Sequence, residues 1–78
     1  MNIYRVWFQK EKKNYQQIFG NRATAIGYAC VISENKDINF VSAREFGCNE
    51  DEGIFEEGNI VYEYGDFDGE ATEWGYVL

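Results

Sequence analysis

Carboxylates and large rings dominate the second half of the chain, where no basic side chain accompanies them. From Glu45 onward the sequence holds eleven Asp and Glu residues and no Lys, Arg or His. Such carboxylates can ligate a cation, transfer protons in pairs or attract a basic surface. The candidate partner-binding residues are Glu50, Asp51, Glu52, Phe55, Glu56, Glu57, Glu63, Asp66, Phe67, Asp68, Glu70 and Glu73.

Cation binding is the first chemistry to test, because the sequence DFDGE has the composition of a calcium loop. An EF-hand needs glycine at its sixth position and carboxylates at its first and twelfth positions. Neither Gly69 nor Gly53 as the sixth residue places carboxylates at both. Zinc ligands are also scarce, since the chain has no histidine and no C-x-x-C sequence. We therefore expect no metal site and no cofactor.

Catalysis is the second possibility, and the residue inventory opposes it. Without histidine, the Ser-His and Cys-His nucleophile pairs are excluded. The eight glycines form neither a phosphate-binding P-loop nor a G-x-G-x-x-G sequence. A carboxylate pair for glycoside hydrolysis would need a deep cleft, which a domain of this size can hardly form. We expect a protein that is not an enzyme, with Cys30 and Cys48 as free, partly buried thiols.

The length and composition predict one folded domain over residues 1–78. Hydrophobic residues make up 45% of the chain and aromatic residues 18%, well above the composition of disordered proteins. No apolar stretch is long enough to span a bilayer, and no secretory leader is recognisable. These features predict a cytoplasmic protein without a membrane partner.

The first half of the chain contains the clearest secondary-structure signals. Residues 2–9 are rich in β-branched and aromatic side chains, which predicts a strand, and residues 15–19 predict a second strand after a charged turn. Asn21 is a suitable N-cap for a helix over residues 22–35. Apolar residues recur there at helical spacing, with Ala25 or Ile26, Ala29 or Cys30, and Ile32 or Ser33 on the packed face.

The second half predicts strands and turns. Residues 37–41 read as a strand, and residues 42–46 either continue it or begin a helix through the capping-box spacing of Ser42 and Glu45; we favour the strand. An acidic loop is expected over 47–53. Strands at 58–64 and 70–78, joined by turn-prone residues 65–69, predict a C-terminal hairpin. The expected fold is α+β, with one helix on a mostly antiparallel sheet of four to five strands.

The charge is distributed unevenly between the two halves. Residues 1–44 carry seven basic and three acidic side chains, a net charge of +4, against −11 for the remainder. An acidic surface improves solubility, and it also steers a basic partner. On a predicted terminal hairpin, Glu63 opposite Glu73 would belong to a stiff anionic surface. Its sign opposes direct nucleic-acid binding, despite the many rings.

The aromatic residues of the acidic half divide into two groups by position. Phe55 and Phe67 fall in predicted loops between acids, so we expect them to be exposed contact residues. A second group of aromatic residues is expected to pack the sheet together with Ile60; these are Tyr62, Tyr64, Trp74 and Tyr76.

The acidic segments NEDEG, FEEG and YGDFDGE, in a short chain without proline, give a resemblance to a class of proteins. The chain resembles the small phage and mobile-element inhibitors of host defence, the anti-CRISPR and anti-restriction proteins, several of which imitate DNA. DFDG is also similar to the D-Y-E-G of anti-restriction DNA mimics, although the second acid differs. The resemblance covers residues 48–73 and implies a stoichiometric inhibitor whose acids occupy nucleic-acid sites.

Three functions are compatible with these features. The first is an acidic protein that binds and inhibits a basic host protein or nucleoprotein complex in the bacterial cytoplasm. The second is an adaptor, an antitoxin or an oligomer-forming structural protein, for example a homodimer, that binds through exposed rings and a sheet edge. The third, a small enzyme or metal binder, requires carboxylates that converge in a pocket.

Overall fold

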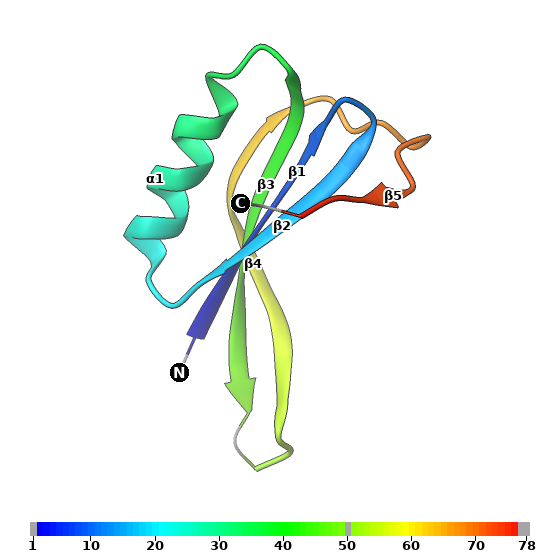
Figure 1. Cartoon of the computed structure of the whole chain (residues 1–78). Helices are drawn as coiled ribbons and strands as arrows, with labels where there is room; N and C mark the ends of the chain where they lie inside the picture. Colours follow the sequence, from blue (N-terminus) through cyan, green and yellow to red (C-terminus); the bar gives the residue numbers. More distant parts are fainter. Residues whose placement is uncertain (1, 50, 77–78) are drawn as a thin grey trace.

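One helix covers one face of a five-stranded sheet in the computed structural model, which describes residues 2–49 and 51–76 (Figure 1). This confirms the predicted α+β class. The strand order is β4-β3-β1-β2-β5, with every neighbouring pair antiparallel except β2 and β5. The elements are β1 (Asn2–Lys10), β2 (Lys13–Phe19), α1 (Arg22–Ser33), β3 (Ile38–Asn49), β4 (Ile54–Gly65) and β5 (Glu73–Trp74).

The core lies between α1 and the sheet. Side chains alternate between the two faces of a strand, so every second residue of the central strand β1 points toward the helix. The helix presents alanines to this layer, and their small size lets the helix backbone approach the sheet closely. The buried residues of the cluster are Tyr4, Val6, Phe8, Ala25, Ala29, Ile38, Val41 and Ala43.

The helix begins where the sequence predicts. The Asn21 side chain accepts a hydrogen bond from the Thr24 backbone N–H at 3.0 Å, which caps the first turn. Ala25 and Ala29 are the buried members of the first two alternative pairs, and Cys30 is exposed rather than partly buried. In the third pair Ile32 and Ser33 are both half-buried, and Ile32 packs against the core. Both cysteines are free thiols, as expected.

The turn between β1 and β2 contains residues that are unusual for its backbone conformation. Lys10 and Lys13 are paired, so the loop consists of Glu11 and Lys12 alone. Both have positive φ, 51° and 65°, in the left-handed region that favours glycine or asparagine. The hairpin therefore forms despite the local preference of these two residues.

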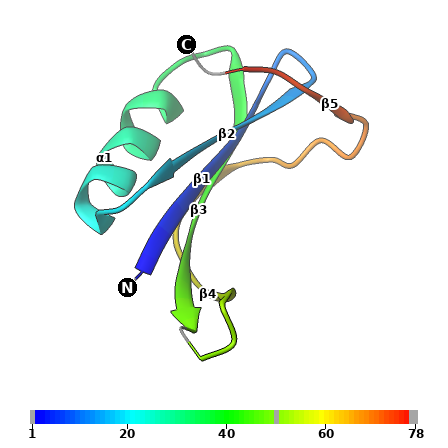
Figure 2. The same ribbon diagram turned by 60° about the horizontal axis from the view of Figure 1, so that its bottom comes forward.

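Strands β3 and β4 form a long hairpin. Residues 42–46 belong to β3, which confirms the strand and excludes the alternative helix. The acidic loop predicted over 47–53 is too long, because β3 continues to Asn49. Gly47 pairs with Asn2 at the start of β1, so the residues beyond it have no third strand beside them. The end of the hairpin projects from the sheet, as Figures 1 and 2 show.

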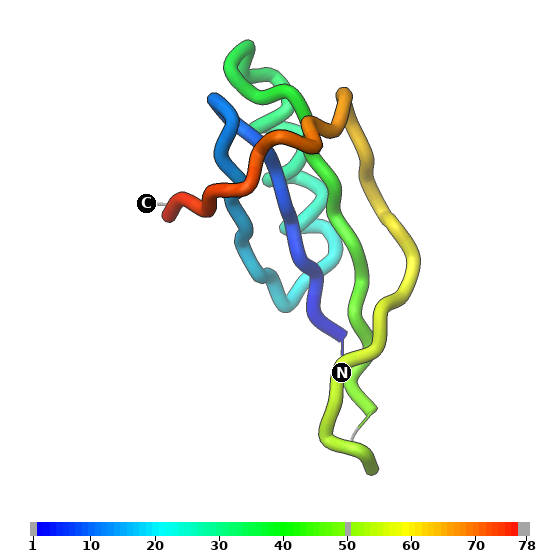
Figure 3. Tube along the Cα trace, turned by 90° about the vertical axis from the view of Figure 1, so that its right-hand side faces the viewer, coloured from blue at the N-terminus to red at the C-terminus, as the bar shows by residue number. Residues whose placement is uncertain are grey.

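The predicted C-terminal hairpin is wrong. β4 pairs with β3 at one edge of the sheet, whereas β5 lies parallel to β2 at the opposite edge. The connecting residues 66–72, which we call the strap, cross the sheet face opposite α1, which we call the open face (Figure 3). Gly65 has a φ of 79°, and the Asp66 N–H donates to the Asn39 carbonyl at 2.8 Å. This turn directs the chain across the sheet instead of back along β4.

The packing predicted for the later aromatic residues is also largely wrong. Tyr62 packs against the core, and its hydroxyl lies 2.7 Å from Ser33 Oγ at the end of the helix. The other residues expected in the core are exposed, since they lie on or next to β4 and β5, the two edges of the sheet, and the single helix covers only part of β4. These exposed residues are Ile60, Tyr64, Trp74 and Tyr76.

The described part of the chain contains no helix with the length and apolar character needed to cross a lipid bilayer.

Candidate protein-binding surface

The candidate acids lie at two ends of the sheet. One group, the hairpin acids, occupies the turn and the start of β4. The other group, the strap acids, follows the crossing segment to β5. The hairpin acids are Asp51, Glu52, Glu56 and Glu57, and the strap acids are Asp66, Asp68, Glu70 and Glu73. Glu50 lies outside the described residues.

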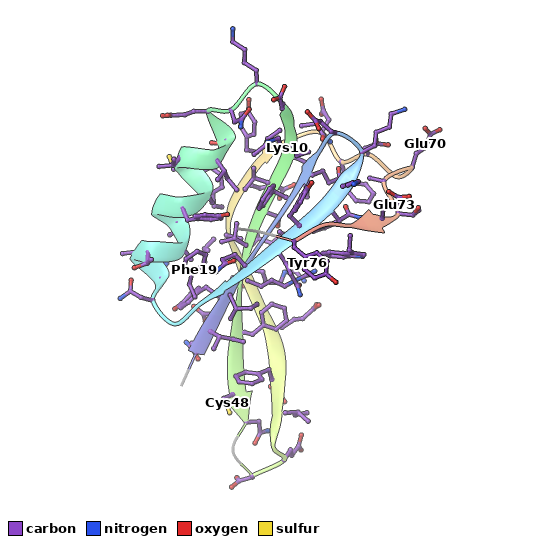
Figure 4. All side chains as sticks on the ribbon, viewed as in Figure 1. Lys10, Phe19, Cys48, Glu70, Glu73 and Tyr76 are labelled. Carbon is purple, nitrogen blue, oxygen red and sulfur yellow. The ribbon has the colours of Figure 1, made fainter. Side chains whose placement is uncertain are left out.

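The two groups are separated along β4. Cys48 near the hairpin end lies far from Glu70 and Glu73 in Figure 4. Gly65 lies eight positions after Glu57 on β4, which at about 3.3 Å per residue is roughly 26 Å. The expected stiff row with Glu63 opposite Glu73 is wrong, because Glu63 pairs with Ser42 on β3. The described candidate acids other than Glu63 form two separate groups instead of one continuous surface, and Glu63 lies on β4 between them.

Most of the described candidate carboxylates form no ion pair with a basic side chain. Arg44 Nη1 lies 2.8 Å from Glu57 Oε2, and this is the only ion pair among residues 2–49 and 51–76. Asp68 is the one half-buried member, and its Oδ1 accepts a hydrogen bond from the Glu70 backbone N–H. The basic first half of the chain therefore leaves the acidic groups largely uncompensated.

Both predicted contact rings are exposed, although their positions differ from expectation. Phe55 lies in β4 rather than in a loop and is half exposed. Phe67 lies in the strap, is 58% exposed and packs one edge against the sheet. Its ring centroid is 5.6 Å from that of Trp7 and 5.7 Å from that of Phe40. Phe55 is therefore free for a partner, whereas Phe67 also holds the strap in place.

A buried amide on β1 anchors the strap. Gln9 is fully buried, and its Nε2 donates to the Asp68 carbonyl and to Asn14 Oδ1, each at 3.0 Å. Its Oε1 accepts from the Asp68 N–H at 2.8 Å and from Asn39 Nδ2 at 3.0 Å. Asn14 Nδ2 in turn donates to the Ala71 carbonyl at 2.7 Å. All hydrogen-bonding positions of the Gln9 amide are therefore satisfied.

The open face carries functional candidates that the sequence patterns do not indicate. Arg5 lies between two indoles, with Cζ at 5.6 Å from the ring centroid of Trp7 and 5.7 Å from that of Trp74. Burial lowers the pKa of the Arg5 guanidinium, and the nearby Glu57 charge partly opposes this shift. Trp74 and Glu57 are far from Arg5 and Trp7 in sequence, so only the arrangement of the strands could have revealed the group.

The outer edge of β4 is a further exposed feature. β3 is the only strand that pairs with β4 in the described sheet, which leaves one row of backbone groups along β4 open. Ile54, Phe55, Ile60 and Tyr64 are exposed along the strand, between the acidic side chains. This edge can accept an added strand, and its negative charge opposes pairing with an identical copy.

Within residues 2–49 and 51–76, no three acidic or cysteine side chains gather in a geometry that could hold a metal ion.

Comparison of the chain with protein-family models, with curated proteins and with solved structures found no match.

Proposed function

We propose that this protein binds a basic protein through its hairpin acids and thereby inhibits it, without catalysing a reaction. The observation that carries the proposal is a set of exposed carboxylates on the projecting hairpin, beside the free edge of β4. Asp51, Glu52 and Glu56 have no ion-pair partner among the described residues. Same-sign charge on a projecting element accelerates encounter with an oppositely charged partner and selects against others.

The proposed target is a nucleic-acid-binding protein, such as a host-defence complex in the bacterial cytoplasm. Duplex DNA presents one charge per roughly 1.7 Å of its axis, so the roughly 26 Å between the acid groups corresponds to about fifteen phosphates. A long basic groove would meet the hairpin acids and the strap acids at two places. The resemblance to phage inhibitors of host defence supports the same target class, with the chain acting as a nucleic-acid mimic.

The experiment compares capture of proteins from bacterial lysate by the wild-type chain and by a charge-reversed variant. The variant carries Asp51→Lys, Glu52→Lys and Glu56→Lys. The matched control carries Glu11→Lys, Glu34→Lys and Asp37→Lys, which change the net charge equally outside both acid groups. Each capture is repeated at about 50 mM and about 500 mM NaCl, where screening lengths differ about threefold. Any partner identified is then purified, and duplex DNA is added as a competitor.

The proposal predicts that the hairpin variant loses the partner, that the control retains it, and that high salt or duplex DNA releases it. Equal capture by all three chains at both salt concentrations would show that the hairpin acids do not bind the partner. Release by salt but not by DNA would retain the electrostatic contact and exclude nucleic-acid mimicry.

A second function, an adaptor or oligomer-forming protein, is favoured by the apolar side chains along the β4 edge. Strand addition at this edge would bury Ile54, Phe55 and Ile60, and high salt would not release the added strand. Sedimentation of the pure protein at low and high salt tests the oligomer-forming version of this function. Self-association that persists at high salt would favour this alternative, and a monomer at both salt concentrations would exclude the oligomer-forming protein.

A further inference from the structure

Two arginines face each other across the centre of the open face. Arg5 on β1 and Arg44 on β3 are direct register partners, and they share the face that the helix does not cover. Like charges in directly opposite positions of an antiparallel pair destabilise a sheet. A fold that holds this pair at its centre needs negative charge close by.

One carboxylate supplies part of that charge. Glu57 Oε2 lies 2.8 Å from Arg44 Nη1, so its principal contact is with Arg44. Arg5 uses its Nε–H to bind Gln16 Oε1 at 2.7 Å, a neutral acceptor. The three charged side chains Arg5, Arg44 and Glu57 together carry one positive charge in excess. Glu63, opposite Ser42 on β3, forms no ion pair with either arginine.

A cavity of about 220 Å³ lies at this position. Its walls combine charged, aromatic and hydroxyl groups; the lining residues are Arg5, Trp7, Ser42, Arg44, Phe46 and Glu57. Trp7 Nε1 is buried and has no hydrogen-bond acceptor in the described part of the chain. Buried N–H groups are normally paired, so this indole lacks the acceptor that a buried donor usually has, and the same side chain lines the cavity.

We propose that this cavity binds a small aromatic carboxylate, a planar ring with one negative charge. The carboxylate would balance the excess positive charge of Arg5 and Arg44, and its oxygens can accept from the guanidinium groups. The ring would pack against Trp7 and Phe46. The volume is below the range of about 300–1,000 Å³ that drug-sized ligands occupy, which limits the ligand to roughly one ring system. This site does not depend on the proposed function of the hairpin acids.

The charge distribution around the cavity opposes larger anions. Glu57 lines it, and Glu63 lies on the same face of β4, so a polyanion such as a nucleic-acid strand would meet repulsion. A neutral ring would leave the excess guanidinium charge without a partner. A ligand with a single negative charge and an aromatic body satisfies both conditions.

The experiment is a titration of the isotopically labelled protein with benzoate, followed through the indole N–H signals in ¹H–¹⁵N NMR spectra. The Trp74→Phe variant assigns the two signals. Benzamide, which has the ring without the charge, and acetate, which has the charge without the ring, serve as probes of each component. We expect a saturable shift of the Trp7 N–H with benzoate and binding about tenfold weaker with benzamide, since charged hydrogen bonds contribute most.

Variants test the position of the site. Arg5→Gln should weaken benzoate binding about tenfold, whereas Arg22→Gln, which removes the same charge from the first turn of α1, should not. Equal binding of benzoate and benzamide to the wild-type protein, or an absence of saturation, would overturn the proposal even if Arg5→Gln fails to fold. Equal weakening by both variants would also overturn it, because the effect would then be one of net charge.

Discussion

Gln9 holds Asp68 by both of its backbone groups, accepting from the N–H at 2.8 Å and donating to the carbonyl at 3.0 Å. The side-chain amide of Gln9, on the central strand, therefore binds the backbone of the strap in the way that the backbone of a neighbouring β-strand would. Because this pairing occupies a fully buried amide, the position of the strap acids depends on a residue in the basic half of the chain.

The substitution Gln9→Ala should destabilise the protein strongly. It removes four hydrogen bonds and leaves the buried Asn14 Oδ1 and the half-buried Asp68 N–H without their partner, each at a cost of about 1–3 kcal/mol. We expect a loss of about 3 kcal/mol in the free energy of unfolding by urea titration. The exposed Gln16→Ala, which loses one bond to Arg5, should cost less than about 1 kcal/mol. Equal losses would contradict the anchoring role.

Glycine substitutions should have opposite effects at two positions. Gly27 is exposed within α1, and an added methyl group would meet no atom within 4 Å, so Gly27→Ala should stabilise by about 0.5–1 kcal/mol. At Gly65, where φ is 79°, the added Cβ would collide with the Asn39 carbonyl. Gly65→Ala should therefore destabilise by more than about 2 kcal/mol. Thermal unfolding followed by circular dichroism measures both.

Replacing the β1–β2 turn should stabilise the fold. Glu11→Asn with Lys12→Gly places residues that tolerate positive φ at both positions, and should gain about 1–2 kcal/mol. The control is Lys36→Gly in the turn after α1, where φ is not positive and no gain is expected. A denaturation midpoint that does not rise in the turn variant would contradict this account of the turn.

Stability should fall at alkaline pH, in part because of Tyr28. Burial against Phe8 and Phe19 raises the pKa of its hydroxyl above 10.0. The Tyr28 hydroxyl therefore loses its proton at a lower pH in the unfolded chain than in the folded chain. Its contribution to the free energy of unfolding is complete below pH 10 and decreases as the pH rises through the folded pKa. Tyr28→Phe should lose less stability than the wild type between neutral pH and pH 11, measured by urea unfolding.

Sequence patterns predicted the elements that depend on local signals. The strand near the N-terminus, the N-cap at Asn21 and the strand over residues 42–46 follow from periodicity and capping. The prediction of a terminal hairpin was wrong, although the chain does turn after β4. The final strand pairs with β2 instead of β4, and contacts outside the turn determine this pairing. Buried amides of Gln9 and Asn14 bind the strap and direct it to β2, and nothing in their local sequence indicates this.

The sequence predicted which residues are exposed on the candidate surface better than it predicted how they are arranged. The exposure of Phe55 and Phe67 follows from their acidic neighbours, and it was predicted correctly. The division of the acids into two groups depends on the crossing of the strap, which local patterns do not encode. The Arg5–Arg44 pair depends on the register of β1 and β3, so it could be recognised only in the structure.

The strap also implies an order of events during folding. Its anchor joins Gln9 to Asp68, residues separated by 59 positions, and closing so long a loop costs more entropy than closing the two-residue turn between β1 and β2. Loops of this length close late, when the surface that receives them already exists. We therefore expect the helix and the four antiparallel strands to assemble first, and β5 to join last.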